Sequence, residues 1–305
     1  MLSILRPLFL LIMTLMPVCL QAQSLQQFDS RPFNAGARAA SLGEAYTAET
    51  EDASALYWNP ASLAFIPAPA IVAAFAMDWD RQSSSNSAGM PFQIADNQRV
   101  VIGLSSTLFG HPWLHPNFVD GGIDLGYANR IAPTLSVGLL TKIRDGGTVG
   151  SSLWTASAAI GVLYYPSPGI SYGLAFRDIG SDVIYSYDNT HGYLSYEKNL
   201  PRSMTIGSAF HFPSTSDHPY VNISMDSELL FGPSRFRNKG GIEIQPWSYL
   251  ALRIGGLTSD SGNVLRMGIG FQFGSFQIDY VVSPGPKTAQ FHEISFALPL
   301  RRSQD

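Results

Sequence analysis

The residues whose types and spacing could support metal chemistry are His111 and His115, in the segment His-Pro-Trp-Leu-His. A separation of four residues places two imidazole rings on one face of a helix, where they can bind a metal ion. Pro112 and Pro116 disfavour a helix there, because proline lacks a backbone N–H and clashes with the preceding turn. We therefore expect no metal site.

Other enzyme motifs lack the structural context that they need. The pattern Gly-x-Ser-x-Gly occurs once, at residues 169–173, but without the strand–turn–helix context of a nucleophile elbow. The segment Gly268-Ile269-Gly270 lacks the strand–turn–helix context of a nucleotide-binding glycine loop. We therefore predict no enzymatic activity, no catalytic residues and no cofactor. A net charge of −4 without a basic run also argues against a nucleic-acid partner.

Charged residues of both signs occupy alternating positions that face the same way as small residues. The basic members are Lys142, Arg144, Arg177, Arg253 and Arg266, and the acidic members are Asp124, Asp226, Glu228, Glu243, Asp279 and Glu293. Opposite charges in a confined interior usually form hydrogen-bonded networks. We favour a network that holds a plug, and the alternative is a polar pathway through the interior.

Four tyrosines crowd one segment, Ile179–Leu200, which we predict to be a long extracellular loop. They are Tyr185, Tyr187, Tyr193 and Tyr196. Aromatic side chains there could bind an apolar ligand or a partner. An interfacial girdle, or packing within the loop, explains them equally well and is the interpretation we favour.

The composition shows that part of the surface does not face water. Of 305 residues, 45% are hydrophobic and only 14% are charged, against roughly 25% charged in ordinary soluble domains. This balance excludes intrinsic disorder, which requires low hydrophobicity and high charge. Either the polar surface is small, or some of the exterior contacts a membrane.

Residues 1–22 are typical of a secretory signal peptide: one basic residue, an apolar run and then a small residue, Ala22. The run is shorter than the ~20 residues that a transmembrane helix needs. The single cysteine, Cys19, could suggest a lipoprotein, but Val18 is too bulky for the usual lipid-attachment motif. Cleavage leaves no cysteine, so no disulfide stabilises the mature chain.

Beyond residue 22 the dominant pattern is strict alternation of apolar and polar or small residues. It is clearest in Val264–Phe273, Phe276–Ser283 and Tyr220–Glu228, and it indicates strands with one apolar face. A soluble sandwich would alternate too. However, segments of ~10 residues match a tilted bilayer crossing, and polar faces rich in Gly, Ser and Ala suit a crowded interior. A membrane β-barrel over residues 69–300 is therefore predicted, followed by a charged tail, 301–305.

Short and long connections alternate along the chain, as in outer-membrane barrels with short periplasmic turns. With a first strand near Ala70–Asp80, a second near Ser87–Ile94 and a third at Arg99–Phe109, this alternation predicts fourteen antiparallel strands. Gly89 and Pro91 weaken the second strand, so twelve strands is the alternative. The predicted fold class is an all-β, 14-stranded transmembrane barrel.

A barrel of that size is too wide to be filled by its own wall, so a plug is expected. Residues 23–68 do not alternate and are rich in Ala and Gly; we predict that they form a small, partly helical hatch. Helix-compatible patches occur at Arg38–Ala48 and Asp52–Tyr57. The segment Asn59-Pro60-Ala61 is predicted to end a helix.

Two motifs in this region, Gly36–Gly43 and Asp52–Ala64, resemble the N-terminal signature of FadL-type transporters, which the PorV/PorQ proteins of type IX secretion share. The resemblance implies that Arg38, Asn59, Pro60 and Ala61 belong to the hatch. Glu44 and Ser62 depart from the pattern, which more often has Gly. The chain also ends in 301–305 rather than in the aromatic residue common at the end of the last barrel strand.

The resemblance implies an outer-membrane protein that takes up hydrophobic molecules, such as long-chain fatty acids, and releases them sideways into the membrane. Its partners would be membrane lipid and a hydrophobic small molecule. A PorV/PorQ-like protein would instead handle exported proteins together with secretion-system partners, and a structural barrel without cargo is a third reading. Nothing in the sequence indicates an oligomeric state.

Overall fold

The computed structural model describes most of the chain after residue 35. The described residues are 36–50, 53–66, 69–78, 83–111, 115–148, 151–180, 182–189, 192–199, 202–213, 220–231, 235–260, 262–283 and 291–299. The predicted signal peptide, 1–22, and the predicted tail, 301–305, lie outside these residues.

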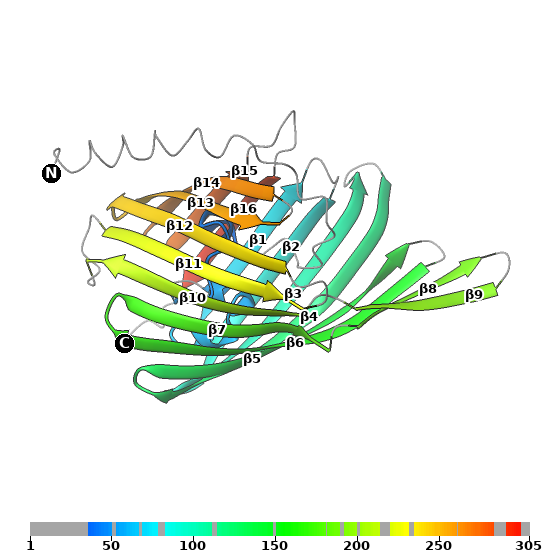
Figure 1. Cartoon of the computed structure of the whole chain (residues 1–305), viewed down its shortest axis with the longest axis horizontal. Helices are drawn as coiled ribbons and strands as arrows, with labels where there is room; N and C mark the ends of the chain where they lie inside the picture. Colours follow the sequence, from blue (N-terminus) through cyan, green and yellow to red (C-terminus); the bar gives the residue numbers. More distant parts are fainter. Residues whose placement is uncertain are drawn as a thin grey trace.

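The strands form one antiparallel sheet that closes on itself (Figure 1). Closure requires that β1 pair with β16 and that β5 pair with β6. Fourteen strands make the wall, as the sequence predicts. They are β1 (Ala70–Asp78), β2 (Ser83–Ala95), β3 (Gln98–His111), β4 (His115–Ala132), β5 (Leu135–Thr148), β6 (Ser151–Ser167), β7 (Ile170–Ile179), β10 (Ser203–Phe212), β11 (Tyr220–Leu230), β12 (Arg235–Trp247), β13 (Leu250–Ser259), β14 (Gly262–Phe273), β15 (Phe276–Ser283) and β16 (Phe291–Pro299).

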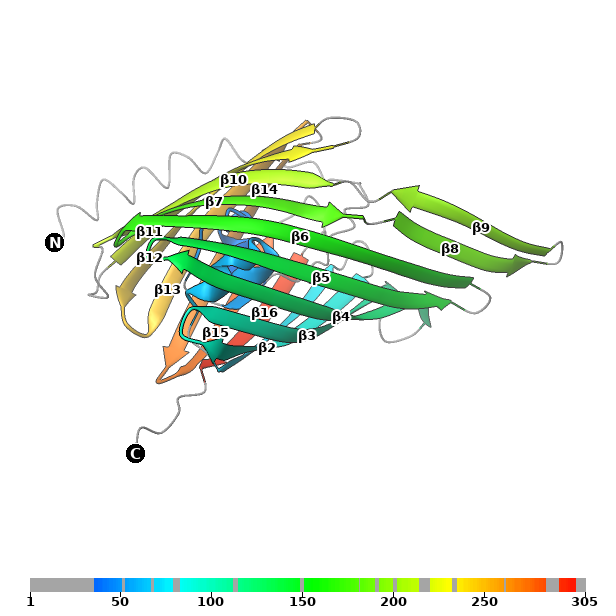
Figure 2. The same cartoon turned by 90° about the horizontal axis from the view of Figure 1, so that it is seen from below.

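Two further strands, β8 (Asp182–Asn189) and β9 (Gly192–Asn199), form a hairpin outside the ring. The hairpin projects beyond the wall (Figure 2). β8 pairs with Ser151–Trp154 of β6, an edge that is available because β6 extends past the end of β7. The segment Ile179–Leu200, predicted to be a long extracellular loop, therefore connects two wall strands, but it contains two strands that the sequence analysis did not predict. Its alternating, Tyr-rich residues favour a strand once a partner edge is present.

The two ends of the barrel differ. One end, here called the turn side, carries five two-residue turns, 96–97, 133–134, 168–169, 248–249 and 274–275. The connection from β10 to β11 joins strand ends on the same side. The opposite end, the loop side, carries the other connections and the β8–β9 hairpin. Strands β3 to β6 have 14 to 18 residues, against 8 to 13 in the other wall strands. As a result β3 ends at His111 and β4 begins at His115, while β5 ends at Thr148 and β6 begins at Ser151.

The faces of the wall strands alternate as the sequence predicts. On the outside, the side chains of Ile102, Leu104 and Ile206 are 54–61% exposed, whereas Gly103 and Gly207 between such positions face inward and are buried. Contiguous exposed apolar surface of this extent is foreign to soluble monomers, and it suits contact with hydrocarbon. None of the described helices is long and apolar enough to cross a bilayer.

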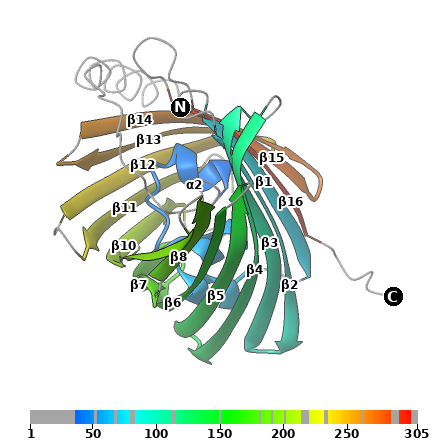
Figure 3. The same cartoon turned by 90° about the vertical axis from the view of Figure 1, so that its right-hand side faces the viewer.

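The N-terminal segment, residues 36–66, lies inside the barrel and is here called the hatch (Figure 3). It contains α2 (Ala37–Ser41), η2 (Ala53–Tyr57) and η3 (Pro60–Ala64). The helix predicted over Arg38–Ala48 is shorter than expected, because Gly43 and Glu44 both adopt φ of 67°. Leu42, Tyr46 and Leu63 are fully buried, so the hatch and the inner wall share one core.

Candidate functional site

The hatch contacts the wall where the wall carries glycine. A Cβ atom on Gly138 would lie 2.3 Å from the carbonyl carbon of Pro60, and one on Gly255 would lie 2.2 Å from the backbone nitrogen of Gly43. These distances are shorter than any real Cβ contact, so only a residue without Cβ permits the approach. The inward-facing glycines of the wall therefore form the surface against which the hatch packs.

Asn59 connects the hatch internally and attaches it to β6. Its Oδ1 accepts a hydrogen bond from the Ala61 N–H (3.1 Å), and its Nδ2 donates to the carbonyl oxygens of Thr47 (2.8 Å) and Val162 (3.0 Å). Asn59 is thus the N-cap of η3, with Pro60 in its first turn. Asn59-Pro60-Ala61 follows the end of η2, as the sequence predicts, but the same residues also begin η3, which the sequence analysis did not predict. Proline suits the first helical turn, where its missing N–H needs no partner.

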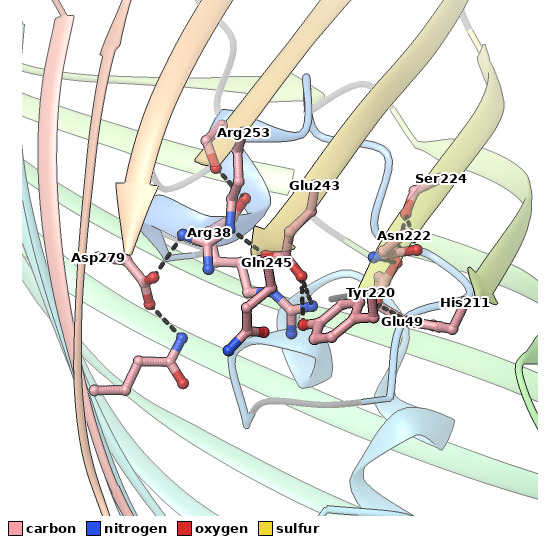
Figure 4. Close-up of polar contacts among 12 residues, drawn as sticks. Arg38, Glu49, His211, Tyr220, Asn222, Ser224, Glu243, Gln245, Arg253 and Asp279 are labelled. Carbon is pink, nitrogen blue, oxygen red and sulfur yellow. Dashed lines mark hydrogen bonds and ion pairs between the residues drawn. The ribbon is translucent and has the colours of Figure 1, made fainter. Parts of the chain in front are cut away.

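On the turn side, Arg38 of α2 binds the wall through its guanidinium. Its Nε and Nη2 donate to the two carboxylate oxygens of Glu243 on β12, at 3.0 and 2.8 Å (Figure 4). Arg253 on β13 also binds Glu243 and donates to Asp279 at 2.6 Å. Tyr220 donates its hydroxyl to Glu243 at 2.8 Å. Charge-assisted, two-pronged contacts of this kind are the strongest side-chain hydrogen bonds.

Two predicted interior acids bind the backbone of the hatch. Asp226 accepts hydrogen bonds from the N–H groups of Tyr46 and Thr47, both at 3.0 Å, and from the Thr47 hydroxyl at 2.7 Å. Glu293 accepts one from the Gly36 N–H at 3.0 Å. These carboxylates therefore satisfy donors of an irregular segment that has few internal partners.

Glu49 is an acid of the hatch that the sequence analysis did not single out. It is fully buried and accepts hydrogen bonds from Asn222 (2.8 Å) and Ser224, while His211 lies 3.5 Å away. Burial alone raises the pKa of the Glu49 carboxyl, but the positive charges of His211 and Arg38 and the hydrogen bond from Ser224 together outweigh it and lower the pKa below its ordinary value. Asn222 and Ser224 lie on the alternating face predicted to point inward, which was the available signal.

On the loop side, a second charged network centres on Glu228 of β11. Its carboxylate contacts Arg177 (2.6 Å), Lys239 (3.1 Å) and Arg237 (3.9 Å). The ring of Trp58 in the hatch lies under two of these cations, 5.5 Å from the Arg177 guanidinium and 5.2 Å from the Lys239 ammonium. This network therefore contacts the loop-side face of the hatch.

Arg266 of β14 pairs with an acid that was not among those predicted for the interior. Its Nη2 lies 2.8 Å from the Glu44 carboxylate, and Lys239 lies 3.6 Å from the same group. The sequence analysis noted Glu44 only as a departure from a family pattern, and it omitted Arg237 and Lys239. Those two bases share the strand parity of Glu243, so alternation in β12 could have placed them inside.

A third group of charges lies near Tyr57. Asp124 on β4 accepts from Arg144 at 2.9 Å and from Ser105 at 3.2 Å, and the Lys142 ammonium lies 5.8 Å from the Tyr57 ring centre. Burial raises the pKa of the Tyr57 phenol, and the negative charge of Asp124 raises it further. The phenol is therefore neutral.

A cavity of about 180 Å³ lies between the hatch and the turn-side ends of β11 to β15. Arg38, Tyr220, Gln245 and Arg253 are among its lining residues (Figure 4). Such a lining suits water or polar groups, and it makes this side of the hatch unfavourable for an apolar molecule.

The remaining candidate residues are the four tyrosines and the two histidines. In the β8–β9 hairpin, Tyr185 pairs with Tyr196, and Tyr193 pairs with Asp188, while Tyr187 lies on β8. His111 and His115 face each other across β3 and β4, not along a helix. Within the described part of the chain, no three His, Cys, Asp or Glu residues are grouped to hold a metal ion.

These features define a class: a closed 14-stranded barrel, apolar outside, whose interior holds the chain's own N-terminal segment. Solved structures have a similar fold. They include the toluene transporter TbuX of Ralstonia pickettii (13% identity, 90% of this chain and 100% of that chain, TM-score 0.62) and the CymD monoaromatic hydrocarbon channel (10%, 88% and 98%, 0.64). A Pseudomonas aeruginosa FadL homologue is also similar (10%, 87% and 98%, 0.61).

The chain therefore has the fold of FadL-type barrels, as the resemblance implied. No protein-family model matches it, and no curated protein does. The comparisons give no support to the narrower PorV/PorQ resemblance.

Proposed function

We propose that this protein is an outer-membrane barrel through which hydrophobic small molecules, such as aromatic hydrocarbons or long-chain fatty acids, enter the cell. The observation that carries the proposal is a barrel with an apolar exterior, closed inside by a hatch bound to the wall through two buried charged networks. The barrels of similar fold include a toluene transporter and a monoaromatic hydrocarbon channel, which supports this reading over a passive pore.

The hatch leaves little space along the barrel axis. On its turn side, Arg38 of the hatch meets Glu243 and Arg253 of the wall, and all three side chains are buried. An apolar molecule that reaches the loop side therefore gains nothing by continuing along the axis into polar surroundings. It lowers its free energy by moving sideways into the hydrocarbon of the membrane.

The seam between β1 and β2 is the part of the wall best suited to a sideways exit. Described pairing between these strands ends at Val72 and Gly89, at the level of Tyr57 in the hatch. Met90–Ala95 of β2, which run from there toward the turn side, pair with β3 alone, so a molecule from the loop side would pass beside Tyr57 to reach the seam. Pro91 cannot donate a ladder hydrogen bond. Ala73 and Ala88 face each other on the outside of the same seam, so few large side chains hold it closed.

Uptake can be measured in a Gram-negative host that lacks its own fatty-acid and hydrocarbon uptake barrels. We expect the full chain to accelerate entry of radiolabelled toluene or oleate over the empty vector. A double variant, Ala73→Cys with Ala88→Cys, introduces a cysteine pair across the seam into a mature chain that has no other cysteine. Oxidation should slow uptake, and a reductant should restore it.

The matched control places Ile254→Cys and Met267→Cys across β13 and β14, also on the outer face. Oxidation of that pair should leave uptake unchanged. Entry no faster than with the empty vector, at normal surface levels, would refute the transport function. Equal uptake before and after oxidation of the β1–β2 pair would refute the exit alone.

The secretion role implied by the PorV/PorQ resemblance has no specific observation in its favour. A deletion strain that fails to export proteins but retains hydrocarbon uptake would establish it in place of transport.

A further inference from the structure

Two arginines on the turn side hold the end of the hatch. Arg99, near the start of β3, donates from Nε to the carbonyl oxygen of Ile66 at 3.2 Å. Arg130, near the end of β4, donates from Nη2 to the carbonyl oxygen of Ala64 at 3.0 Å. Arg99 lies opposite Ala128 in the β3–β4 register, so Arg130 is its diagonal neighbour on the same inward face. Two cations therefore lie side by side at the turn-side end of the interior.

These two arginines differ from other interior bases because their partners are carbonyl oxygens. Arg144 and Arg177 each bind a fully buried carboxylate. Among the described residues, neither Arg99 nor Arg130 forms an ion pair, and their side chains contact carbonyl oxygens and one aromatic ring. The nearest acid along the chain, Asp96, is exposed in the turn 96–97 and takes part in none of the described ion pairs. Neutral acceptors leave the two positive charges uncompensated.

Both guanidinium groups have N–H donors to spare. A guanidinium carries several N–H donors in a planar fork, and the described hydrogen bonds use one in each arginine. Arg99 Nη1 and Arg130 Nε are buried without a hydrogen-bond partner among the described residues. Arg99 as a whole is only 9% exposed. Because a buried donor without an acceptor is unfavourable, an acceptor with several oxygens would stabilise both groups.

An aromatic ring orients one of the two cations. The Arg130 guanidinium lies over the Phe65 ring, 4.5 Å from its centre. Phe65 in turn packs against Tyr165 of β6, with ring centres 5.9 Å apart. A guanidinium that rests on a ring by its face keeps its N–H edge available, and that planar edge matches the oxygens of a phosphate. The contact thus holds Arg130 in an orientation suited to an oxyanion.

The pair lies beside the incomplete end of the β1–β2 seam. Arg99 is opposite Gln93 of β2, and Met90–Ala95 of β2 have no described pairing with β1. On the outer face of this stretch, Phe92 and Ile94 are 37% and 56% exposed. Barrel strands end at the membrane interface, where phospholipids carry their phosphate groups. A lipid phosphate on the turn side is therefore one strand away from the arginines.

We propose that Arg99 and Arg130 form a binding site for a phosphate group on the turn side of the hatch. The phosphate oxygens accept charge-assisted hydrogen bonds from both guanidinium groups and offset their charge. The phosphate belongs to a phospholipid head group or is free inorganic phosphate, and the test separates these sources. Because the same arginines bind the carbonyl oxygens of Ala64 and Ile66, the bound group also fixes the end of the hatch. The proposal does not depend on the uptake function.

The test titrates two probes calorimetrically into the purified full chain in a non-ionic maltoside detergent: dihexanoyl phosphatidylglycerol and inorganic phosphate. Dihexanoylglycerol, which has the same acyl chains and no phosphate, is the reference compound. The wild type should bind phosphatidylglycerol more tightly than dihexanoylglycerol. Arg99→Gln and Arg130→Gln should each weaken phosphatidylglycerol binding about tenfold and leave dihexanoylglycerol unchanged.

Two control variants separate the site from general effects. Arg202→Gln removes an exposed arginine outside the site. Ser136→Ala removes the hydrogen bond that Ser136 donates to the Ala61 carbonyl oxygen of η3 at 2.9 Å, so it loosens the same end of the hatch without removing a base. Neither should alter the affinity for phosphatidylglycerol. Heat-modifiable electrophoretic mobility verifies folding.

If a glutamine variant fails to fold, the lysine variant at the same position serves instead. Lysine keeps the charge and loses the planar fork, so Arg99→Lys or Arg130→Lys should weaken binding by a smaller factor. Binding of both probes, each weakened by the arginine variants, supports a site open to free phosphate. Binding of phosphatidylglycerol alone, weakened in the same way, identifies the lipid head group as the source.

Equal affinity of phosphatidylglycerol for the wild type and both arginine variants would overturn the proposal. Failure of both probes to bind the wild type would do the same, and water would then be the partner of the spare donors. Either result leaves the uptake function standing, because entry of toluene or oleate is measured separately.

Discussion

A single side chain, Arg38, contributes strongly to the attachment of the hatch to the wall. Its guanidinium makes two hydrogen bonds to Glu243, and both groups are buried. Removing one partner of a buried pair costs about 3–5 kcal/mol, because the other charge is left uncompensated. That loss is large compared with the few contacts of a five-residue helix such as α2.

We therefore expect Arg38→Met to loosen the hatch and to admit hydrophilic antibiotics. The measurement is the minimal inhibitory concentration of vancomycin in cells expressing the variant, which should fall several-fold. Arg202→Met is the control, since Arg202 is exposed at the start of β10. Unchanged sensitivity at normal surface levels would contradict the role of Arg38.

Asn59 gives a second expectation at this scale, because its cap and its two donated bonds can be separated. Asn59→Ala removes both, whereas Asn59→Asp keeps the cap acceptor and places a carboxylate against the carbonyl oxygens of Thr47 and Val162. Loss of a cap alone costs about 1 kcal/mol. We expect Asn59→Asp to lower the thermal unfolding midpoint in detergent at least as much as Asn59→Ala. A wild-type midpoint for Asn59→Asp would show that only the cap matters.

Among the structural elements, the inward faces of the wall strands carry the glycines on which the hatch lies. These glycines lie where the hatch backbone comes closest to the wall: Gly138 of β5 contacts Pro60, and Gly255 of β13 contacts Gly43. Added atoms in such a contact force backbone shifts that cost about 1–3 kcal/mol. The wall thus has a shape that fits one particular plug.

Gly138→Ala should consequently destabilise the folded barrel and increase antibiotic entry. Gly240→Ala is the matched control, because a Cβ there would meet only the Ser224 carbonyl oxygen at 3.7 Å, an ordinary contact. Thermal unfolding followed by heat-modifiable mobility distinguishes them. Equal midpoints for the two variants would mean that the hatch adjusts to the wall instead of matching it.

For the molecule as a whole, the outward apolar surface makes stability depend on depth in the membrane. Ile206 lies near the middle of β10 and is 58% exposed, whereas Phe273 ends β14 beside a turn and is 62% exposed. An arginine on the lipid face costs about 2–4 kcal/mol at the midplane and about 0–1 near an interface.

In phospholipid vesicles, Ile206→Arg should therefore lower the free energy of unfolding far more than Phe273→Arg. Guanidinium titration followed by tryptophan fluorescence measures both. Similar, small losses at the two positions would mean that the wall does not lie in lipid.

Much of the architecture follows from local pattern. The period of two in segments such as Val264–Phe273 determines which side chains face lipid, because alternate side chains of any strand point to opposite faces. The alternation of turns and loops predicted fourteen wall strands. The need to fill so wide a barrel predicted a hatch from residues 23–68, of which the described residues, 36–50 and 53–66, are largely buried.

Other features could not be predicted, because they depend on groups that meet only when the barrel closes. The hydrogen bond from Gly36 to Glu293 joins residues 257 positions apart. The β8–β9 strands needed the free edge of β6. Asn59 caps η3 through its Oδ1, and its Nδ2 is held by carbonyl oxygens of the hatch and the wall that meet only in the folded barrel. The pairing of Arg266 with Glu44 required the turn after α2 to meet β14.

The amino-acid sequence by itself determined the barrel, its apolar exterior and the presence of an internal segment, since alternation and composition act through the local backbone and through solvation. Only the tertiary structure decided which charges pair and which of them are buried. Coulomb energies depend on distance and burial, and closure of the ring establishes both.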